Sequence, residues 1–419
     1  MAEEKKVLLS VQHLEQFFKM GRQKLKAVND VNFDIYKGEV FGLVGESGCG
    51  KTTTGRSIIR LYNITGGSVY FDGQRICAGI NRYKEMIAAA KAKANAQIKE
   101  LKAQPESAER DAKIDEINKN LNELIAEQTA EIKKAKHDQK YCNKDFARHE
   151  MQLVREKYQP KLDALPEGEE KAALEKEMKA ELKLASKDRI MNKVQMIFQD
   201  PIASLNPRMT VREIIAEGLI IRGIKDKKYI DEQVYKVLDL VGLVPEHAGR
   251  YPHEFSGGQR QRIGIARAII LNPELIIADE PVSALDVSIQ AQVINLLNEL
   301  RSRLGLTIMF IAHDLSVVKY FSDRIAVMYF GKIVELATSD ELFAHPLHPY
   351  TKSLLSAIPL PDPHFEKQRK RIVYNPVAAH DYSKQQPYMQ EIVPGHFIYC
   401  NDAEFEKYKK EIAEADAQK

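Results

Sequence analysis

Short apolar runs bounded by turn residues mark the first part of the chain. Their length and spacing predict strands at residues 7–11, 31–35, 40–44 and 68–71. The run at 40–44 leads into a glycine-rich loop and then into residues 53–60, which have helical spacing. We therefore expect residues 7–80 to form a β-rich region that contains one helix.

The pattern changes at about residue 81, where the chain becomes rich in Lys, Glu and Ala. Four apolar side chains recur there with the 3-4-3 spacing of a helix that packs on another helix, namely Ile114, Ile117, Leu121 and Leu124. Breaks at Pro105, at Pro160 and at the turn 166–168 predict about four helices. Since both ends must return to one sheet, we expect residues 81–188 to form an inserted helical hairpin or small bundle. Its charged faces point to water, and it carries no chemistry of its own.

The globular pattern resumes at Val194. Residues 194–198 predict a strand, and the runs 275–278 and 308–311 are continuously apolar, as in buried parallel strands. Residues 342–419 are rich in Pro, His and Tyr and predict an appended, less regular unit. We expect an α/β protein whose three parts are a main domain of residues 1–80 and 189–341, the helical arm 81–188, and the extension 342–419.

Composition changes this picture little, but it excludes several classes of protein. The 62 basic and 59 acidic residues leave a net charge of +3, which gives no sign of a nucleic-acid partner. Cys49, Cys77, Cys142 and Cys400 are scattered, so neither a disulfide framework nor a cysteine metal site is expected. The N-terminus lacks the apolar stretch of a signal peptide, and no apolar run reaches the roughly 20 residues that cross a bilayer. We expect a cytosolic chain that associates with a membrane only through a partner.

The most specific signal is the run GESGCGKTT at residues 45–53. It fits the pattern G-x-x-x-x-G-K-[ST] and lies between a predicted strand and a predicted helix. In that setting the glycines let backbone N–H groups surround phosphate oxygens at a helix N-terminus. Lys51 is expected to reach the β- and γ-phosphates, and Thr52 to place its hydroxyl on Mg²⁺. The loop thus predicts nucleotide binding by Gly45, Glu46, Ser47, Gly48, Cys49, Gly50, Lys51, Thr52 and Thr53.

Two further segments offer carboxylates and anion-binding donors. The apolar run 275–278 ends in Asp279 and Glu280. Asp279 can hold the Mg²⁺ shell, and Glu280 is placed to polarise an attacking water. The motif FSGGQR at 255–260 opens a predicted helix, 260–271, and offers hydroxyl and backbone donors to an anion.

Two polar residues follow the other apolar runs. Gln199 comes directly after residues 194–198, and its uncharged amide can contact a metal or a water. His313 comes two residues after the run 308–311, where its imidazole could sense a γ-phosphate. Each is a weak signal alone, but together they complete an ordered set.

That ordered set resembles the ATP-binding-cassette (ABC) family, over residues 7–80 and 189–360. The family order is reproduced by the Walker A motif at 45–53, the Q-loop at Gln199, the signature at 255–259, the Walker B motif at 275–280, the D-loop at 283–286 and the H-switch at His313. The resemblance implies a P-loop NTPase fold with a RecA-like core, an antiparallel β subdomain and a helical subdomain. Phe255 replaces the leucine that usually begins the signature.

The resemblance also implies roles for single residues. Those implied to act on one ATP are Lys51, Thr52, Gln199, Asp279, Glu280 and His313, with Thr52, Gln199 and Asp279 on Mg²⁺. Those implied to contact the ATP of a partner cassette are Ser256, Gly257 and Gly258, and nucleotide contacts are further expected from Gln259 and Asp286. The adenine-stacking aromatic of the family is Phe17 or Phe18, and spacing does not decide between them.

Two longer motifs are similar to the ATPase subunits of oligopeptide and dipeptide importers. They are QDPIASLNPR at 199–208 and HPLHPYTKSLL at 345–355. The arm 81–188 departs from the usual family pattern. Many relatives carry a C-terminal cysteine cluster associated with an iron–sulfur centre, and because Cys400 stands alone in that region, no cluster is expected.

The resemblance implies an ATPase at the cytoplasmic face of the cell membrane that powers peptide import. Its implied partners are a second ATPase subunit, expected to be a D-type paralogue in a heterodimer, two integral membrane permease subunits and an extracellular or periplasmic peptide-binding protein, without nucleic acid. Import of dipeptides or nickel stays open because other subunits choose the substrate. A non-transport cassette ATPase with a helical arm is a further alternative.

Overall fold

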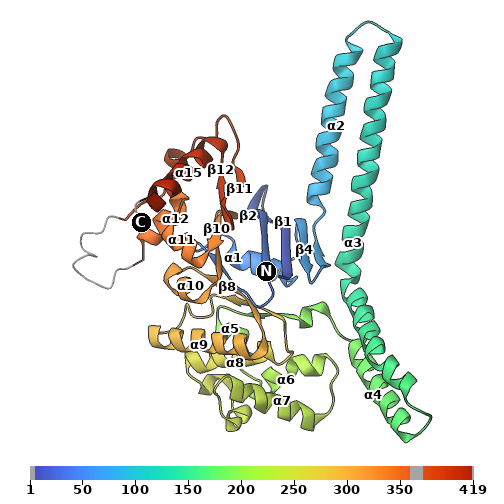
Figure 1. Cartoon of the computed structure of the whole chain (residues 1–419), viewed down its shortest axis with the longest axis vertical. Helices are drawn as coiled ribbons and strands as arrows, with labels where there is room; N and C mark the ends of the chain where they lie inside the picture. Colours follow the sequence, from blue (N-terminus) through green and yellow to red (C-terminus); the bar gives the residue numbers. More distant parts are fainter. Residues whose placement is uncertain (1–4, 359–370, 418–419) are drawn as a thin grey trace.

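Two sheets and an elongated helical arm make up the chain (Figure 1). The computed structural model describes residues 5–358 and 371–417. The larger sheet has the strand order β11-β12-β10-β9-β3-β8-β7-β6. Its strands are β3 (Val40–Val44), β6 (Val194–Ile197), β7 (Leu275–Asp279), β8 (Thr307–Ala312), β9 (Arg324–Tyr329), β10 (Lys332–Thr338), β11 (Tyr388–Val393) and β12 (His396–Cys400).

The parallel part of this sheet positions the candidate site. Strands β9, β3, β8, β7 and β6 pair in parallel with one another, in that order. Every residue of β3, β7 and β8 is buried, as the continuous apolar runs predict. Because parallel strands end at one edge of a sheet, the loops after β3, β6, β7 and β8 meet there.

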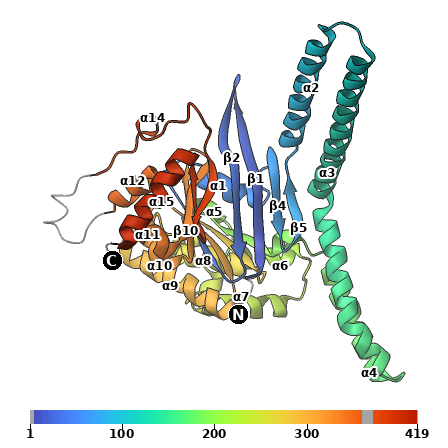
Figure 2. The same ribbon diagram turned by 45° about the horizontal axis from the view of Figure 1, so that its top comes forward.

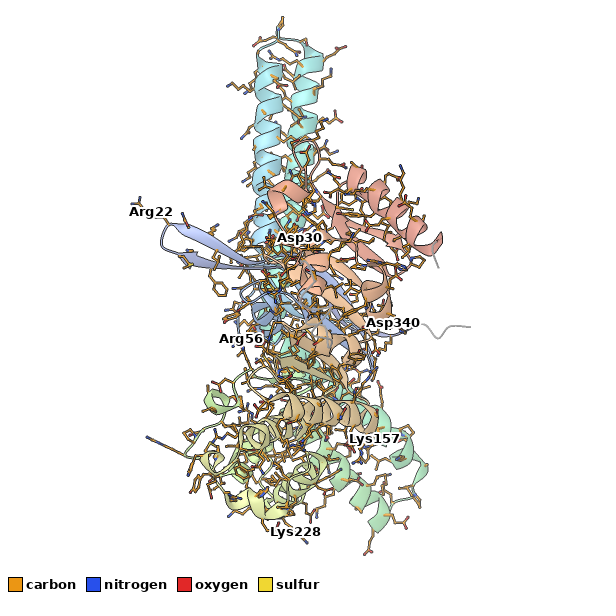
Figure 3. The ribbon with its side chains drawn as sticks, turned by 90° about the vertical axis from the view of Figure 1, so that its left-hand side faces the viewer. Arg22, Asp30, Arg56, Lys157, Lys228 and Asp340 are labelled. Atoms are coloured by element: carbon orange, nitrogen blue, oxygen red, sulfur yellow. The ribbon has the colours of Figure 1, made fainter. Side chains whose placement is uncertain are left out.

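The second sheet is antiparallel and has the order β2-β1-β4-β5. Its strands are β1 (Val7–Met20), β2 (Gln23–Tyr36), β4 (Gly66–Phe71) and β5 (Gln74–Ala78). Its apolar face shares one buried cluster with the central sheet, in which Leu9 and Val69 join Phe41 and Ile311. The sheet stands between the C-terminal extension and the arm (Figure 2). The hairpin of β1 and β2 projects from the body, with Arg22 at its tip (Figure 3).

Helices connect the strands of the central sheet. They are α1 (Lys51–Ile58), α5 (Pro201–Ser204), α6 (Val211–Ile221), α7 (Lys227–Leu240), α8 (Gly257–Ile269), α9 (Val287–Leu304) and α10 (Leu315–Phe321). Helices α6, α7 and α8 gather at one end of the body (Figure 1). Helix α8 begins at Gly257 rather than at residue 260 as predicted, because Ser256 already caps its N-terminus.

The arm has three helices in place of the predicted four or so: α2 (Asn81–Lys102), α3 (Ala108–Ala164) and α4 (Glu169–Ala185). The predicted break at Pro160 is wrong, since Pro160 lies inside the last turns of α3. Packing on α4 holds this end of the helix together: Lys157 pairs with Glu181 at 2.9 Å, and the Tyr158 hydroxyl donates to Glu177 at 3.0 Å. The N–H that proline lacks therefore costs the helix one hydrogen bond without ending it.

The arm forms two helical hairpins that point in opposite directions from a common waist (Figure 1). Helix α2 pairs with the first part of α3, where the four predicted seam residues are half-buried, and α4 pairs with its last part. The waist of α3 docks on β5: Asp138 pairs with Arg75 at 2.7 Å, and the Cys142 carbonyl accepts from Gln74 at 3.0 Å. Among the described helices, including the 57-residue α3, none combines the length and apolar character that a bilayer-spanning segment needs.

The C-terminal extension is joined to the central sheet rather than appended to it. Its helices are α11 (Ser339–Ala344), α12 (Pro349–Ser356), α14 (Pro376–Ala379) and α15 (Asp402–Ala417). Strand β12 pairs with β10, with Glu335 opposite Ile398, and β11 then forms the outer edge. The extension is therefore more regular than expected, because β12 pairs with the edge of β10 and β11 pairs with β12. The boundary predicted at residue 342 falls inside α11.

Candidate nucleotide-binding site

The glycine-rich loop between β3 and α1 lies against backbone on two sides. Gly45, Gly48 and Gly50 have φ values of 155°, 81° and 112°. A Cβ on Gly45 would lie 2.2 Å from the Met328 carbonyl oxygen, and one on Gly50 would lie 2.3 Å from the Ala27 carbonyl oxygen. Both positions thus require glycine for close approach as well as for their backbone conformation.

Lys51 lies folded over this loop and is 4% exposed. Its ammonium donates to the carbonyl oxygens of Gly45 and Glu46 at 2.8 and 2.9 Å. The Glu280 Oε1 atom lies 3.8 Å away. The loop therefore encloses a positive charge that an incoming phosphate can attract away from neutral carbonyls.

Thr52 and Asp279 meet across the strand ends. The Thr52 hydroxyl donates to Asp279 Oδ1 at 2.7 Å, while the buried Oδ2 atom has no hydrogen-bond partner. Burial raises the pKa of Asp279, against the effect of the Thr52 hydrogen bond. A hydroxyl and an unpaired carboxylate oxygen suit Mg²⁺, which takes oxygen ligands and keeps phosphates and waters in its shell. Among the described residues no group of three or more His, Cys, Asp or Glu side chains could hold a metal without such help.

The side chains of Gln199 and His313 both contact one carboxylate oxygen of Glu280. The Gln199 amide donates to Glu280 Oε2 at 3.0 Å, and the His313 Nδ1 atom lies 3.3 Å from the same oxygen. The three residues follow β6, β7 and β8, which are neighbours in the sheet. Glu280 has a φ of 43°, and its N–H donates to the Ile311 carbonyl at 3.0 Å, which fixes its direction. A cavity of about 60 Å³ lined by Glu280 and His313 has room for water.

The signature residues stand apart from this cluster. Ser256 and Gln259 form a capping box at the start of α8, in which each side chain accepts the other residue's N–H, at 3.3 and 3.0 Å. Ser256 and Gly257 are exposed, and Gly258 is half-buried. Asp286 is also exposed, at the N-terminus of α9. The structure thus gathers one part of the predicted site around the loop and leaves the other part on the surface.

Comparisons with known proteins agree with this geometry. The family described as "ABC transporter" matches residues 28–155 and 151–283, and "Oligopeptide/dipeptide transporter, C-terminal region" matches residues 334–389. The oligopeptide transport ATP-binding protein OppF of Bacillus subtilis (strain 168) is 46% identical over 402 residues, which cover 96% of this chain and 98% of that protein. The chain belongs to the ATP-binding proteins of oligopeptide/dipeptide ABC transporters.

A further relative extends this finding within the family. The dipeptide transport ATP-binding protein DppF of Lactococcus lactis subsp. cremoris (strain MG1363) is 42% identical over 414 residues, covering 98% of this chain and 99% of that protein.

Family membership confirms several expectations. The chain is an ABC ATPase, and its fold is that of an ABC nucleotide-binding domain with an antiparallel sheet subdomain. The alternative of a non-transport cassette ATPase is excluded, since both family matches are to transporters.

Phe17 and Phe18, the two candidates for adenine stacking, remain undecided in this ABC ATPase. Both are half-buried in β1. The Lys26 ammonium lies 5.3 Å from the Phe17 ring, whereas Phe18 packs edge-on against Tyr62 with the ring centres 5.3 Å apart. To stack on adenine, Phe17 would give up its contact with Lys26 or Phe18 its contact with Tyr62, so these contacts favour neither ring.

Cys49 is the one loop residue whose chemistry the sequence leaves open, between a reactive and a shielded thiol. Its side chain is buried, and a Cβ on Gly45 would lie 2.8 Å from its sulfur. Burial raises the pKa of the Cys49 thiol, against the effect of the nearby Lys51. The structure favours the shielded thiol.

The sequence interpretation missed one residue at the loop. The Tyr350 hydroxyl accepts a hydrogen bond from the Glu46 N–H at 3.0 Å. The motif that contains Tyr350 is visible in the sequence, but nothing in it points to a loop 304 residues earlier. A second support is non-local too, since the Gly331 N–H donates to the Cys49 carbonyl at 2.8 Å.

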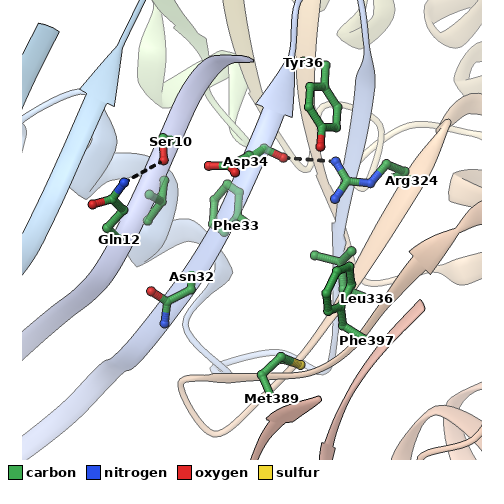
Figure 4. A pocket seen from close by; sticks show the side chains of 11 residues that line it. Ser10, Gln12, Asn32, Phe33, Asp34, Tyr36, Arg324, Leu336, Met389 and Phe397 are labelled. Carbon is green, nitrogen blue, oxygen red and sulfur yellow. Dashed lines mark hydrogen bonds between the residues drawn. The ribbon is translucent and has the colours of Figure 1, made fainter. Parts of the chain in front are cut away.

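A larger hollow lies elsewhere on the cassette (Figure 4). It has a volume of about 350 Å³ and is lined by residues of β1, β2, β10 and the β11–β12 hairpin, with Arg324 at one side. The Arg324 guanidinium donates to the Asp34 carbonyl at 3.1 Å and to Glu39 at 3.2 Å. No predicted nucleotide residue lines this hollow, so its size alone does not indicate the site of hydrolysis.

Proposed function

We propose that this ATPase powers the import of oligopeptides across the cytoplasmic membrane. The observation that carries the proposal is the match of residues 334–389 to the oligopeptide/dipeptide transporter C-terminal region, in a chain that is 46% identical to a protein named for oligopeptide transport. The intact set of loop, carboxylate, amide and imidazole groups supports ATP hydrolysis as the energy source.

In the proposed mechanism, the phosphates of ATP occupy the loop 45–53. Lys51 leaves the Gly45 and Glu46 carbonyls for the β- and γ-phosphates, since it gives up neutral acceptors for charged ones. Thr52 and Asp279 would hold the cation, and Gln199 would contribute its amide oxygen. Bound Mg²⁺ supplies charge neutralisation and orientation of the phosphates.

Glu280 then takes a proton from the attacking water at its Oε2 atom. The 60 Å³ cavity beside Glu280 and His313 supports this placement of the water. Gln199 and His313, which now contact Oε2, hold that oxygen toward the cavity and are positioned to detect the γ-phosphate. The Glu280 carboxylate lies 3.8 Å from the Lys51 ammonium, which places a base beside the phosphate loop.

A partner cassette is proposed to complete the site. Ser256 and Gly257 are exposed at a helix N-terminus, which attracts anions, yet no described hydrogen bond links them to this chain's own loop. We assign Ser256, Gly257, Gly258, Gln259 and Asp286 to contacts across a head-to-tail dimer, with a D-type paralogue as the partner. Loss of the bridging phosphate on hydrolysis then lets the dimer open.

The opening motion is proposed to reach two integral membrane permease subunits through residues 199–210. Helix α5 follows Gln199 directly, and its Ile202 is 65% exposed, which supports a contact surface there. A peptide-binding protein outside the membrane would deliver the substrate. This arrangement places the chain at the cytoplasmic face as a peripheral subunit.

The test is peptide uptake by cells that lack their own peptide-transporter ATPases and carry this chain with its partner ATPase, its permease subunits and its peptide-binding protein. We expect uptake of a labelled tetrapeptide, and none with Lys51→Ala. Uptake of dipeptides only would favour the second candidate, dipeptide import, which the 42% identity to a dipeptide transport protein supports. Uptake of neither peptide, with ATPase activity intact, would refute the proposal.

A further inference from the structure

The back of the phosphate loop is held by a buried tyrosine of the C-terminal extension. Tyr350, at the start of α12, is 1% exposed. Its hydroxyl accepts the Glu46 N–H at 3.0 Å. No role in nucleotide binding is assigned above to this residue, which belongs to the extension rather than to the cassette core.

The Glu46 peptide is fixed on both sides. Its N–H donates to Tyr350, and its carbonyl oxygen accepts from the Lys51 ammonium at 2.9 Å and from the Cys49 N–H at 3.3 Å. When Lys51 moves to phosphate, the carbonyl loses its charged donor. The Tyr350 hydrogen bond does not involve Lys51. It can therefore persist while the Lys51 ammonium moves from the loop carbonyls to the phosphates.

Tyr350 is itself placed by a rigid turn. Glu335 is fully buried in β10 and accepts the Leu347 and His348 N–H groups at 2.8 and 3.1 Å. His348 caps α12, with its Nδ1 accepting the Tyr350 N–H at 3.1 Å. Burial lowers the pKa of His348 to about 3, so the ring stays neutral and Nδ1 keeps its lone pair. Pro349 at the first helical position fits the same start.

Aromatic packing holds the Tyr350 ring in place. The Tyr329 ring lies 4.4 Å from it and the Tyr374 ring 5.5 Å, measured between ring centres. Tyr329 ends β9, two residues before Gly331, whose N–H donates to the Cys49 carbonyl. The extension and the β9–β10 turn therefore support the loop as one packed unit.

We infer that Tyr350 is a positioning residue whose hydroxyl preforms the phosphate loop before nucleotide arrives, so that the C-terminal extension sets the nucleotide affinity of the cassette. The inference rests on the proposed phosphate site. Preforming a binding loop lowers the ordering cost of binding. It acts on the bound substrate and the transition state alike, so it changes KM and leaves kcat.

The experiment compares Tyr350→Phe with Tyr329→Phe in the assembled transporter and in the isolated chain. Tyr350→Phe keeps the ring and removes the hydroxyl. Tyr329→Phe removes a hydroxyl from the neighbouring ring, whose described contacts with the loop region are by packing. A hydrogen bond is worth about 1 kcal/mol, which corresponds to an about fivefold change. A hollow of about 270 Å³ lined by Glu46 and Tyr350 admits water in place of the hydroxyl and keeps the effect in this modest range.

We expect Tyr350→Phe to raise the Kd of a fluorescent ATP analogue and the KM for ATP about fivefold. The kcat should stay that of the wild type, the Tm of the nucleotide-free chain should fall by no more than about 4 °C, and Tyr329→Phe should match the wild type in all four quantities. An unchanged Kd for Tyr350→Phe would overturn the inference. A fall in kcat together with Tm would overturn it too, because that pattern marks a merely structural role. The Lys51→Ala variant distinguishes failure of this inference from failure of the proposed phosphate site. Normal nucleotide binding by Lys51→Ala would show that the phosphate site itself is misplaced.

Discussion

The phosphate-loop region and the signature region of this chain differ in how completely their polar groups are hydrogen-bonded. At the phosphate loop, Lys51 and Asp279 are buried, and Asp279 Oδ2 has no hydrogen-bond partner. At the signature, Ser256 and Gln259 satisfy each other in a capping box and face solvent. The first region is a charged network with an unpaired carboxylate oxygen, and the second is a capped helix start that a ligand can approach from solvent.

The difference in hydrogen bonding indicates which nucleotide each half can bind. A buried, unpaired carboxylate oxygen is unfavourable unless a cation or proton meets it, so the loop half is built around something bound. An exposed capping box needs nothing further for stability. We therefore assign this capping box to contacts with an ATP that a partner cassette holds.

In the phosphate-loop half, the largest effect on ATP hydrolysis is expected from Glu280→Gln. The change removes the proposed base while keeping the shape and the contacts of Gln199 and His313. We expect kcat for ATP hydrolysis in the assembled transporter to fall at least about 100-fold, the lower range for a general base. The Kd for ATP should change little. Turnover within about tenfold of the wild type would contradict the role of Glu280.

The signature half is tested by Ser256→Ala, and Ser107→Ala is its matched control. Ser107 also caps a helix, α3 of the arm, where its hydroxyl accepts the Arg110 N–H at 3.2 Å. Each change should lower the free energy of unfolding by about 1 kcal/mol, measured in urea. Only Ser256→Ala should reduce ATP hydrolysis by the assembled transporter, on the order of 100-fold, since it removes a donor to charge in the transition state. Equal activity of the two variants would contradict the signature role.

The support behind the loop can be examined through pH. His396 is fully buried between Glu335 at 2.9 Å and Glu341 at 3.2 Å. Burial acts to lower its pKa, but these carboxylates together raise it above the ordinary value. The ion pair should thus stabilise the fold fully below about pH 6.5 and be lost as pH rises through the raised pKa.

The measurement is the free energy of unfolding of the wild type and of His396→Gln, from pH 5.5 to 9. We expect the difference between them to be largest at the acidic end and to shrink with rising pH. A difference that does not depend on pH would show that His396 is neutral in the folded chain.

The smallest effect is expected at Cys49. Its thiol is buried and its pKa is raised, and the other three cysteines are buried as well. A thiol reagent should label the folded chain slowly and inhibit ATP hydrolysis little, with or without ATP, whereas the urea-unfolded chain should react at once. Rapid inhibition that ATP prevents would show that the loop opens and exposes the sulfur.

The sequence predicts the loop half well because its signals are local. The pattern of 45–53 lies between its strand and helix, and Gln199, Glu280 and His313 each follow an apolar run whose type predicts a parallel strand. The edge where they meet then follows from the geometry of parallel sheets. These residues therefore lie together as expected.

The remaining features depend on contacts that no local pattern carries. Pro160 breaks helices in general, but here α4 packs beside it and α3 continues. Strand β12 joins β10 because Glu335 and His396 pair across the two strands, which neither segment reveals alone. The hydrogen bond between Tyr350 and Glu46 joins residues 304 positions apart, so no local pattern indicates it.

The central claim is that this chain's loop binds ATP for itself while its signature serves another subunit. The most direct test is a titration of the isolated, monomeric chain with a fluorescent ATP analogue, for Lys51→Ala and Ser256→Ala in parallel. The account predicts that Lys51→Ala weakens binding at least about tenfold, as the loss of a charged hydrogen bond does, and that Ser256→Ala leaves the Kd unchanged. Equal weakening by both variants would show that the two halves act on one nucleotide within one chain, and would contradict the account.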